Sequence, residues 1–168
     1  ATVTSWRGIE GGITAARRGH DVVMNASGDL YLDYLQTASP DEPPGRPALI
    51  PLKQVYDFEP VPAALDARQA RHILGVQANV WTEHMRSFER VQHAYFPRIA
   101  ALAEVAWTPK DGRDYADFLT RLPALLPQWR ASGVAYAKTP FQPLFDATGP
   151  DAAGKLRVTL TQPLGYEL

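Results

Sequence analysis

The 168-residue sequence contains no cysteine. Disulfide bridges, thiolate nucleophiles and the usual cysteine-rich zinc clusters are therefore excluded. The four histidines show no HExxH motif or similar ligand spacing, so they indicate no metal centre. We therefore expect neither a metal nor a cofactor.

Long apolar runs and an excess of one charge are also missing. No run of about 18 apolar residues occurs, so no segment is expected to span a bilayer. The formal net charge of −1 gives no electrostatic reason to expect binding to nucleic acid or to an anionic membrane. With 45% hydrophobic and 21% charged residues, the composition is that of an ordinary globular protein with one core.

Three strand candidates alternate with helical or irregular segments. They cover residues 2–6, 21–26 and 72–80. The second contains three consecutive apolar residues, which is typical of a strand buried on both faces of a parallel sheet. A short helix is expected over 9–18, and a long proline-rich stretch, 27–62, is expected to be irregular. Loops of this length inside a compact domain are usually functional or disordered.

Two stronger helices are expected after the third strand. Apolar residues at steps of three or four indicate the first: Val91, Tyr95, Ile99, Leu102 and Ala106. Pro97 lies inside this helix and is a candidate kink. The second helix is expected over residues 114–131, with Pro123 and Pro127 weakening its middle.

The character of the sequence changes near its end. Prolines and glycines predict a linker over 136–154, and residues 155–161 alternate polar and apolar, as in a half-buried antiparallel strand. A lone strand is not stable. The strand must therefore pair elsewhere or begin a second domain, which we predict over 155–168, after a first domain over 1–135.

Alternation of strands and helices predicts an α/β fold with parallel strands. Three such units cannot close a sheet on their own, and a (β/α)8 barrel needs about 250 residues. The chain is therefore either a small open α/β domain or the last part of a larger barrel.

Aromatic rings and acids follow the predicted strands. Trp6 ends the first strand, Tyr31 and Asp33 follow the second, and Trp81 and Glu83 follow the third. Ligand groups gather at the carboxyl ends of strands in barrels and open α/β sheets. Rings stack on the apolar face of a sugar and carboxylates accept hydrogen bonds from its hydroxyls, whereas a phosphate site would need glycines and basic residues. The pattern therefore indicates a neutral sugar ligand.

Three motifs resemble one family. Trp81-Thr82-Glu83, Tyr31-Leu32-Asp33 and the helix segment 96–107, FPRIAALAEVAW, are similar to the C-terminal part of the catalytic barrel of family 20 glycoside hydrolases, the β-N-acetylhexosaminidases. The resemblance covers about residues 1–135 and implies that the chain supplies the last three strand–helix units of a (β/α)8 barrel. The segment after Leu156 resembles the start of a small β-sandwich domain.

The resemblance implies a role for each site residue. Tyr31 would donate its hydroxyl to the acetamido carbonyl of the substrate, which is the nucleophile in this substrate-assisted, retaining mechanism. Trp6 and Trp81 would wall the pocket, and Asp33 and Glu83 would accept hydrogen bonds from the O4 and O6 hydroxyls.

The Asp-Glu pair that supplies the acid in this family lies on an earlier strand. Asp41-Glu42 stands in a proline-flanked loop with no strand before it, so we interpret it as a coincidence. The chain alone is then expected to be inactive. In the helix motif, Arg98 and Glu104 are expected to be structural, and Trp107 is expected to pack in the core.

Three functions remain open from the residues. The chain is either part of an exo-β-N-acetylhexosaminidase acting on glycans that end in N-acetylglucosamine or N-acetylgalactosamine, or a non-catalytic α/β fragment that binds carbohydrate or a partner. The third is another barrel hydrolase or an open α/β binding protein. Open sheet edges would favour association with the missing barrel half or with copies of the chain. The resemblance implies a location in the bacterial envelope (the periplasm) or outside the cell.

Overall fold

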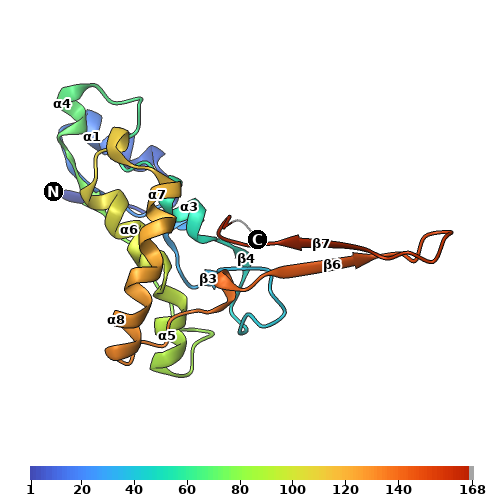
Figure 1. The fold of residues 1–168 in the computed structure, drawn as a ribbon. Coiled ribbons are helices and arrows are strands. Elements are labelled where there is room, and N and C mark those ends of the chain that lie inside the picture. The colour runs from blue at the N-terminus through green and yellow to red at the C-terminus, as the bar shows by residue number, and fades with distance from the viewer. Residues whose placement is uncertain (167–168) are drawn as a thin grey trace.

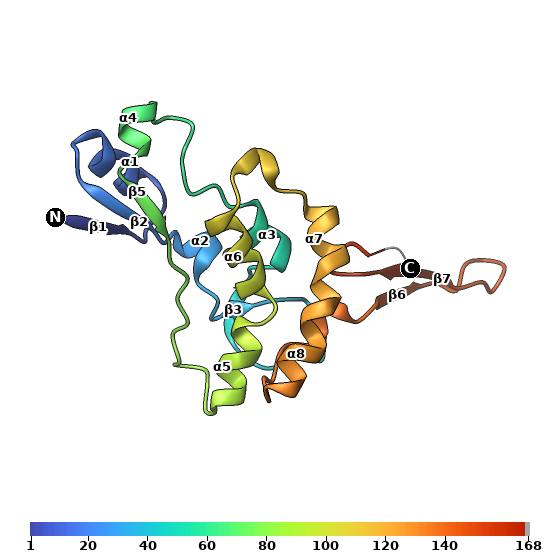
Figure 2. The same ribbon diagram turned by 60° about the vertical axis from the view of Figure 1, so that its left-hand side comes forward.

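The centre of the molecule is a three-stranded parallel sheet. The computed structural model describes residues 1–166. Strands β1 (Thr2–Ser5), β2 (Asp21–Met24) and β5 (Ile73–Val76) pair in the order β1-β2-β5, and Figure 2 shows the three side by side. Val22 and Met24 on the central strand are fully buried, as the apolar run predicts. The predicted α/β fold with parallel strands is confirmed.

Helix α1 (Glu10–Arg17) connects β1 to β2 and packs on the sheet through Ile13 and Ala16. Gly12 makes this close packing possible. A Cβ atom at this position would lie 2.7 Å from the Met24 sulfur. The glycine weakens the helix intrinsically, but any larger residue would push the helix away from the sheet.

The proline-rich stretch after β2 contains more regular structure than the sequence predicts. It folds into short elements: α2 (Ser27–Leu30), β3 (Tyr34–Leu35), β4 (Arg46–Leu49) and α3 (Leu52–Asp57). Strands β3 and β4 pair with each other in parallel. The prolines keep each element short, as expected, but do not prevent the loop from folding. Helix α4 (Ala67–Ala70) then leads into β5.

The third strand is shorter than the predicted 72–80 because its last residues leave the sheet. Beyond Val76 the chain pairs instead with the segment that follows α2. Leu32 donates its N–H to the Asn79 carbonyl at 2.7 Å, and the Asn79 N–H donates to the Leu30 carbonyl at 3.0 Å. This exchange forms an isolated parallel bridge between Tyr31 and Asn79.

Both long predicted helices are divided at prolines. The first becomes α5 (Phe88–Tyr95) and α6 (Arg98–Trp107), because Phe96 is extended and Pro97 has no N–H to continue the helix. The second becomes α7 (Tyr115–Arg121) and α8 (Leu125–Ala131), joined by the 3-10 turn η2 (Leu122–Ala124) that contains Pro123. A further 3-10 turn, η1 (Lys110–Gly112), precedes α7.

The hydrophobic core lies between the sheet, α3, α6 and α7. Val55, Leu102 and Phe118 are among its buried members. Trp107 does not join them: the prediction that it packs in the core is wrong, because it stands at the end of α6 and its side chain is 88% exposed. None of the helices within residues 1–166 is long and apolar enough to cross a membrane.

A β-hairpin projects from the body after the 3-10 turn η3 (Thr139–Phe141), as Figure 1 shows. Strand β6 (Leu144–Thr148) pairs antiparallel with β7 (Arg157–Thr161). The predicted final strand therefore has a partner, and this partner lies inside the segment predicted as a linker. Beyond β7, the Leu164 carbonyl accepts a hydrogen bond from the Tyr115 hydroxyl at 3.1 Å. The chain thus returns to α7, and the division into two domains stays a prediction.

Candidate functional site

The carboxyl ends of the three parallel strands open onto one cavity of about 590 Å³. Four of the five predicted site residues, Trp6, Tyr31, Trp81 and Glu83, line this cavity. Its wall is completed by Thr4, Asn25, Arg46 and Asn79. The strand-end pattern therefore brings together side chains that are far apart in the sequence. Trp6 and Glu83 are separated by 77 positions (83 minus 6).

Trp6 is placed by the turn that follows β1. The Ser5 hydroxyl donates to the Gly8 carbonyl at 2.6 Å and accepts from the Gly12 N–H at 2.9 Å. The Trp6 carbonyl accepts a hydrogen bond from the Ser27 N–H at 2.8 Å. These bonds tie the backbone around Trp6 to the first turn of α1 and to the start of α2, at the edge of the sheet.

Tyr31 and Trp81 are brought together by the backbone bridge at Asn79. Their ring centroids lie 6.2 Å apart with an interplanar angle of 52°. Tyr31 is 7% exposed, whereas Trp6 and Trp81 are 48% and 49% exposed. The tyrosine is therefore fixed at the base of the cavity, and the two indoles offer open faces to a ligand.

Asp33, the fifth predicted residue, lies beside the cavity rather than in its wall. Its side chain is only 3% exposed, and Oδ2 accepts a hydrogen bond from Arg46 Nη1 at 3.3 Å. The other carboxylate oxygen, Oδ1, is buried and has no hydrogen-bond partner. A buried acceptor without a partner is costly, which makes Oδ1 a candidate for a ligand hydroxyl.

Arg46 is the basic residue that sequence reasoning missed. It comes from β4, in the stretch expected to be irregular, and its guanidinium lies over the Tyr34 ring at 4.6 Å. Its hydrogen bond to Asp33 raises its pKa. No strand-end rule could find it, because only the pairing of β3 with β4 brings it to the cavity.

Two asparagines of the cavity wall were also missed. Asn25 is the first residue after β2; it is 2% exposed, and its Oδ1 lacks a hydrogen-bond partner. Asn79 accepts a hydrogen bond from the Gln77 side chain at 2.7 Å. Asn25 could have been found by extending the strand-end rule from acids and rings to amides.

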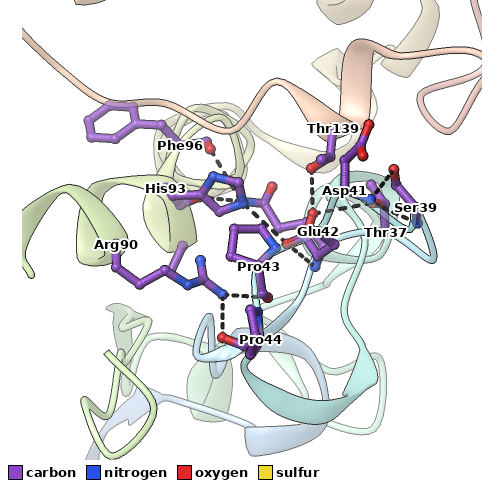
Figure 3. Close-up of polar contacts among 12 residues, drawn as sticks. Thr37, Ser39, Asp41, Glu42, Pro43, Pro44, Arg90, His93, Phe96 and Thr139 are labelled. Atoms are coloured by element: carbon purple, nitrogen blue, oxygen red, sulfur yellow. Dashed lines mark hydrogen bonds and ion pairs between the residues drawn. The ribbon is translucent and has the colours of Figure 1, made fainter. Parts of the chain in front are cut away.

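Asp41-Glu42 takes no part in this cavity, and Figure 3 shows Glu42 bonded elsewhere. Its carboxylate accepts hydrogen bonds from the hydroxyls of Thr37 and Thr139 and contacts His93 Nε2 at 3.2 Å. Burial raises the pKa of Glu42, but the hydrogen bonds with His93 and Thr139 outweigh burial, so its pKa lies below the ordinary value of 4.5. We call these four residues the Glu42 cluster.

Arg98 and Glu104 make structural contacts, as the sequence predicts. The fully buried Arg98 guanidinium donates to the carbonyls of Leu32, Ile50 and Ala94. Glu104 accepts from the Tyr56 hydroxyl at 3.1 Å and from Arg121 at 2.8 Å. Within residues 1–166, no group of three or more acidic or histidine side chains could hold a metal ion.

The rings and acids therefore lie at the carboxyl ends of parallel strands, where ligand groups gather in barrels and open α/β sheets. The family described as "Glycosyl hydrolase family 20, catalytic domain" matches residues 1–110. The chain belongs to glycosyl hydrolase family 20.

Two curated relatives carry hexosaminidase names. The chain is 47% identical over 123 residues to the beta-hexosaminidase of Porphyromonas gingivalis, covering 73% of this chain and 16% of the relative. It is 32% identical over 128 residues to the beta-N-acetylhexosaminidase of Cellulomonas fimi, covering 76% of this chain and 26% of the relative. The chain thus spans about a quarter or less of the length of these relatives.

Solved structures of the same family have the same fold. An exo-β-N-acetylglucosaminidase from Vibrio harveyi, in complex with N-acetylglucosamine, matches with a TM-score of 0.73 and 37% identity, over 82% of this chain and 22% of that one. The Streptomyces plicatus N-acetyl-β-hexosaminidase, in complex with Thio-NAglucal, matches with a TM-score of 0.72 and 28% identity, over 83% and 29% of the two chains.

Proposed function

We propose that the chain is the C-terminal portion of the (β/α)8 barrel of an exo-β-N-acetylhexosaminidase and supplies the half of the active site that holds the substrate. The observation that carries this proposal is the convergence of Trp6, Tyr31, Trp81 and Glu83 on one cavity at the carboxyl ends of β1, β2 and β5. The outer edges of β1 and β5 have no strand partner within residues 1–166, so further barrel strands could pair with them.

The geometry suits recognition of an amino sugar. The half-exposed rings of Trp6 and Trp81 would stack on the sugar and enclose its acetamido methyl group. The Tyr31 hydroxyl, held beside Trp81, would donate to the acetamido oxygen as that oxygen attacks the anomeric carbon. Glu83 and the free oxygen of Asp33 would accept hydrogen bonds from the O4 and O6 hydroxyls. Such charged acceptors strengthen each bond and reject ligands that lack the hydroxyl.

The acid would come from outside this chain. Glu42 is held within the Glu42 cluster, away from the cavity, and is therefore not a candidate. The Asp-Glu pair of the family would be supplied by the remaining part of the barrel. Its Glu would protonate the glycosidic oxygen, which leaves as the acetamido oxygen attacks the anomeric carbon, and water would then open the oxazolinium-like intermediate with retention. The substrates would be glycans ending in N-acetylglucosamine or N-acetylgalactosamine.

Replacement of Tyr31 by phenylalanine in the protein with its complete barrel tests this proposal. We expect Tyr31→Phe to lower kcat on a chromogenic N-acetylglucosaminide by about 10²- to 10³-fold, because one donor to the developing charge is lost. Tyr136→Phe is the matched control, since Tyr136 lies outside the cavity and its hydroxyl accepts a hydrogen bond from Arg130 at 3.3 Å. An unchanged kcat for Tyr31→Phe would remove Tyr31 from the mechanism.

A further inference from the structure

The Asp33 carboxylate is held asymmetrically. One oxygen, Oδ2, accepts from Arg46, and the other, Oδ1, is buried with no partner. Asp33 itself does not line the cavity, whereas Arg46 does. The guanidinium is therefore the group that joins this buried carboxylate to the cavity wall.

We propose that Arg46 is a positioning residue for sugar recognition: it holds Asp33 by Oδ2 so that Oδ1 is presented to one hydroxyl of the terminal sugar. This inference rests on the proposed function. The Asp33 side chain is only 3% exposed, and burial of a carboxylate is costly unless it is bonded to a partner, as Asp33 is to Arg46.

Arg46 is itself held in place by its surroundings. Its guanidinium lies over the Tyr34 ring at 4.6 Å, and Tyr34 pairs with Arg46 across the two short strands β3 and β4. The side chain nevertheless remains 43% exposed. A planar guanidinium fixed by stacking and by one carboxylate loses little further freedom when a ligand binds.

Arg46 is also close to both acids that are proposed to bind the ligand. It lines the cavity together with Glu83 while bonding Asp33. Two carboxylates that approach one sugar repel each other, and a cation close to both reduces that repulsion. Lysine could supply the charge, but it lacks the planar stacking surface, so it should replace Arg46 only in part.

The test compares substrates in the protein with its complete barrel. We expect Arg46→Gln to lower kcat/KM on a chromogenic N-acetylglucosaminide by about 10- to 100-fold, mainly through KM, because one charge-assisted hydrogen bond is lost. The 4-deoxy and 6-deoxy analogues each lack one candidate hydroxyl. On the analogue that lacks the hydroxyl bound by Asp33, Arg46→Gln should lower kcat/KM by less than about threefold. Arg157→Gln, an exposed arginine of the hairpin, should retain wild-type kinetics on all three substrates.

Further variants separate a positioning role from a merely structural one. Asp33→Asn combined with Arg46→Gln should be no weaker than Asp33→Asn alone, because both changes remove one interaction. Arg46→Lys should recover part of the kcat/KM that Arg46→Gln loses. If Arg46→Gln does not fold, the kinetics of Arg46→Lys on the same substrates test the positioning role. An equal loss on every substrate, additive losses in the double variant, or unchanged kinetics overturns the inference. An inactive wild-type protein would instead overturn the proposed function.

Discussion

Arg98 is the residue on which the base of the site depends. Its guanidinium is fully buried and satisfies three backbone carbonyls, one of them on Leu32, between Tyr31 and Asp33. Burial lowers the pKa of Arg98 to about 9, and the nearby carboxylates of Glu42 and Asp33 oppose this effect. The group therefore remains charged at neutral pH, and the carbonyl oxygens stabilise that charge.

Replacement of this guanidinium should be strongly destabilising. We expect Arg98→Met to lower the free energy of unfolding by about 3–5 kcal/mol, because it leaves buried carbonyl oxygens unpaired. Urea unfolding followed by circular dichroism measures the change. Arg71→Met, at an exposed arginine, should lie within about 0.5 kcal/mol of wild type. Equal unfolding midpoints for the two variants would contradict the role given to Arg98.

At the scale of residues, the sequence predicts side chains that follow strands directly. Trp6 is found this way because the direction of β1 brings it to the carboxyl edge of the sheet. Trp81 and Glu83 reach the same edge because the chain continues from β5 through the bridge at Asn79. Arg46 is not, because its position depends on a loop that folds back and pairs β4 with β3. Trp107 shows the opposite error: a large apolar residue at the end of a helix is exposed rather than buried.

At the scale of elements, the Glu42 cluster joins three segments. The carboxylate bonds Thr37 in the loop before β4, His93 on α5, and Thr139 in η3. Only 3% of the Glu42 side chain is exposed. The proline-rich loop is therefore fixed to α5 and η3. Within the Asp41-Glu42 dipeptide, Glu42 has a structural function.

This cluster should make stability depend on acid pH. The folded-state pKa of Glu42 lies below 4.5, so the unfolded chain binds more protons as the pH falls below that value. The stabilisation is complete above pH 4.5 and is lost as the pH falls through the folded-state pKa. Glu42→Gln should unfold about 1–3 kcal/mol more easily at pH 7 and show a shallower loss of stability in acid.

Thermal melts between pH 3 and pH 7 measure this difference. Asp41→Asn is the matched control, because the Asp41 side chain is next to Glu42 in the sequence but is exposed and takes no part in the Glu42 cluster. If Glu42→Gln and wild type lose stability in parallel as the pH falls, the cluster does not carry the acid dependence.

The types of the longer elements were predictable, but their ends were not. Apolar periodicity predicts the helices around α6 and α7, yet it cannot decide whether a proline kinks a helix or divides it. The first helix is divided because Phe96 is extended just before Pro97, and the second because Pro123 lies in the 3-10 turn between α7 and α8. Likewise, β5 ends early because its continuation gains backbone partners at Leu30 and Leu32.

At the scale of the whole molecule, two surfaces lack a cover. The outer edges of β1 and β5 have no paired strand among residues 1–166. The hairpin has one apolar face, where Phe145 is opposite Leu160 and Ala147 is opposite Val158. Phe145 and Leu160 are 75% and 58% exposed. Unpaired edges and exposed apolar faces both favour association between chains.

We therefore expect the isolated 168-residue chain to self-associate. Light scattering after size-exclusion chromatography should show species larger than 18.5 kDa. Phe145→Ser with Leu160→Thr should reduce association by removing part of the apolar surface, whereas Thr159→Ser on the opposite face should not. A single species of 18.5 kDa at high concentration would contradict this expectation.

The number of strand–helix units was predictable from the sequence, because each strand is followed by a clear helical or turn signal. The pairing of β6 with β7 was not, because glycines and prolines around residues 144–148 hide a short strand. Strand pairing is a long-range property, and local composition does not determine it.

The bridge between Tyr31 and Asn79 limits how the site can be altered. Residues 77–81 run directly from β5 through this bridge to Trp81, so their number fixes which way the indole points. Insertion or deletion of one residue here would turn Trp81 and Glu83 to the opposite side. Remodelling of substrate preference should therefore proceed by side-chain replacement in this segment and not by changes of its length.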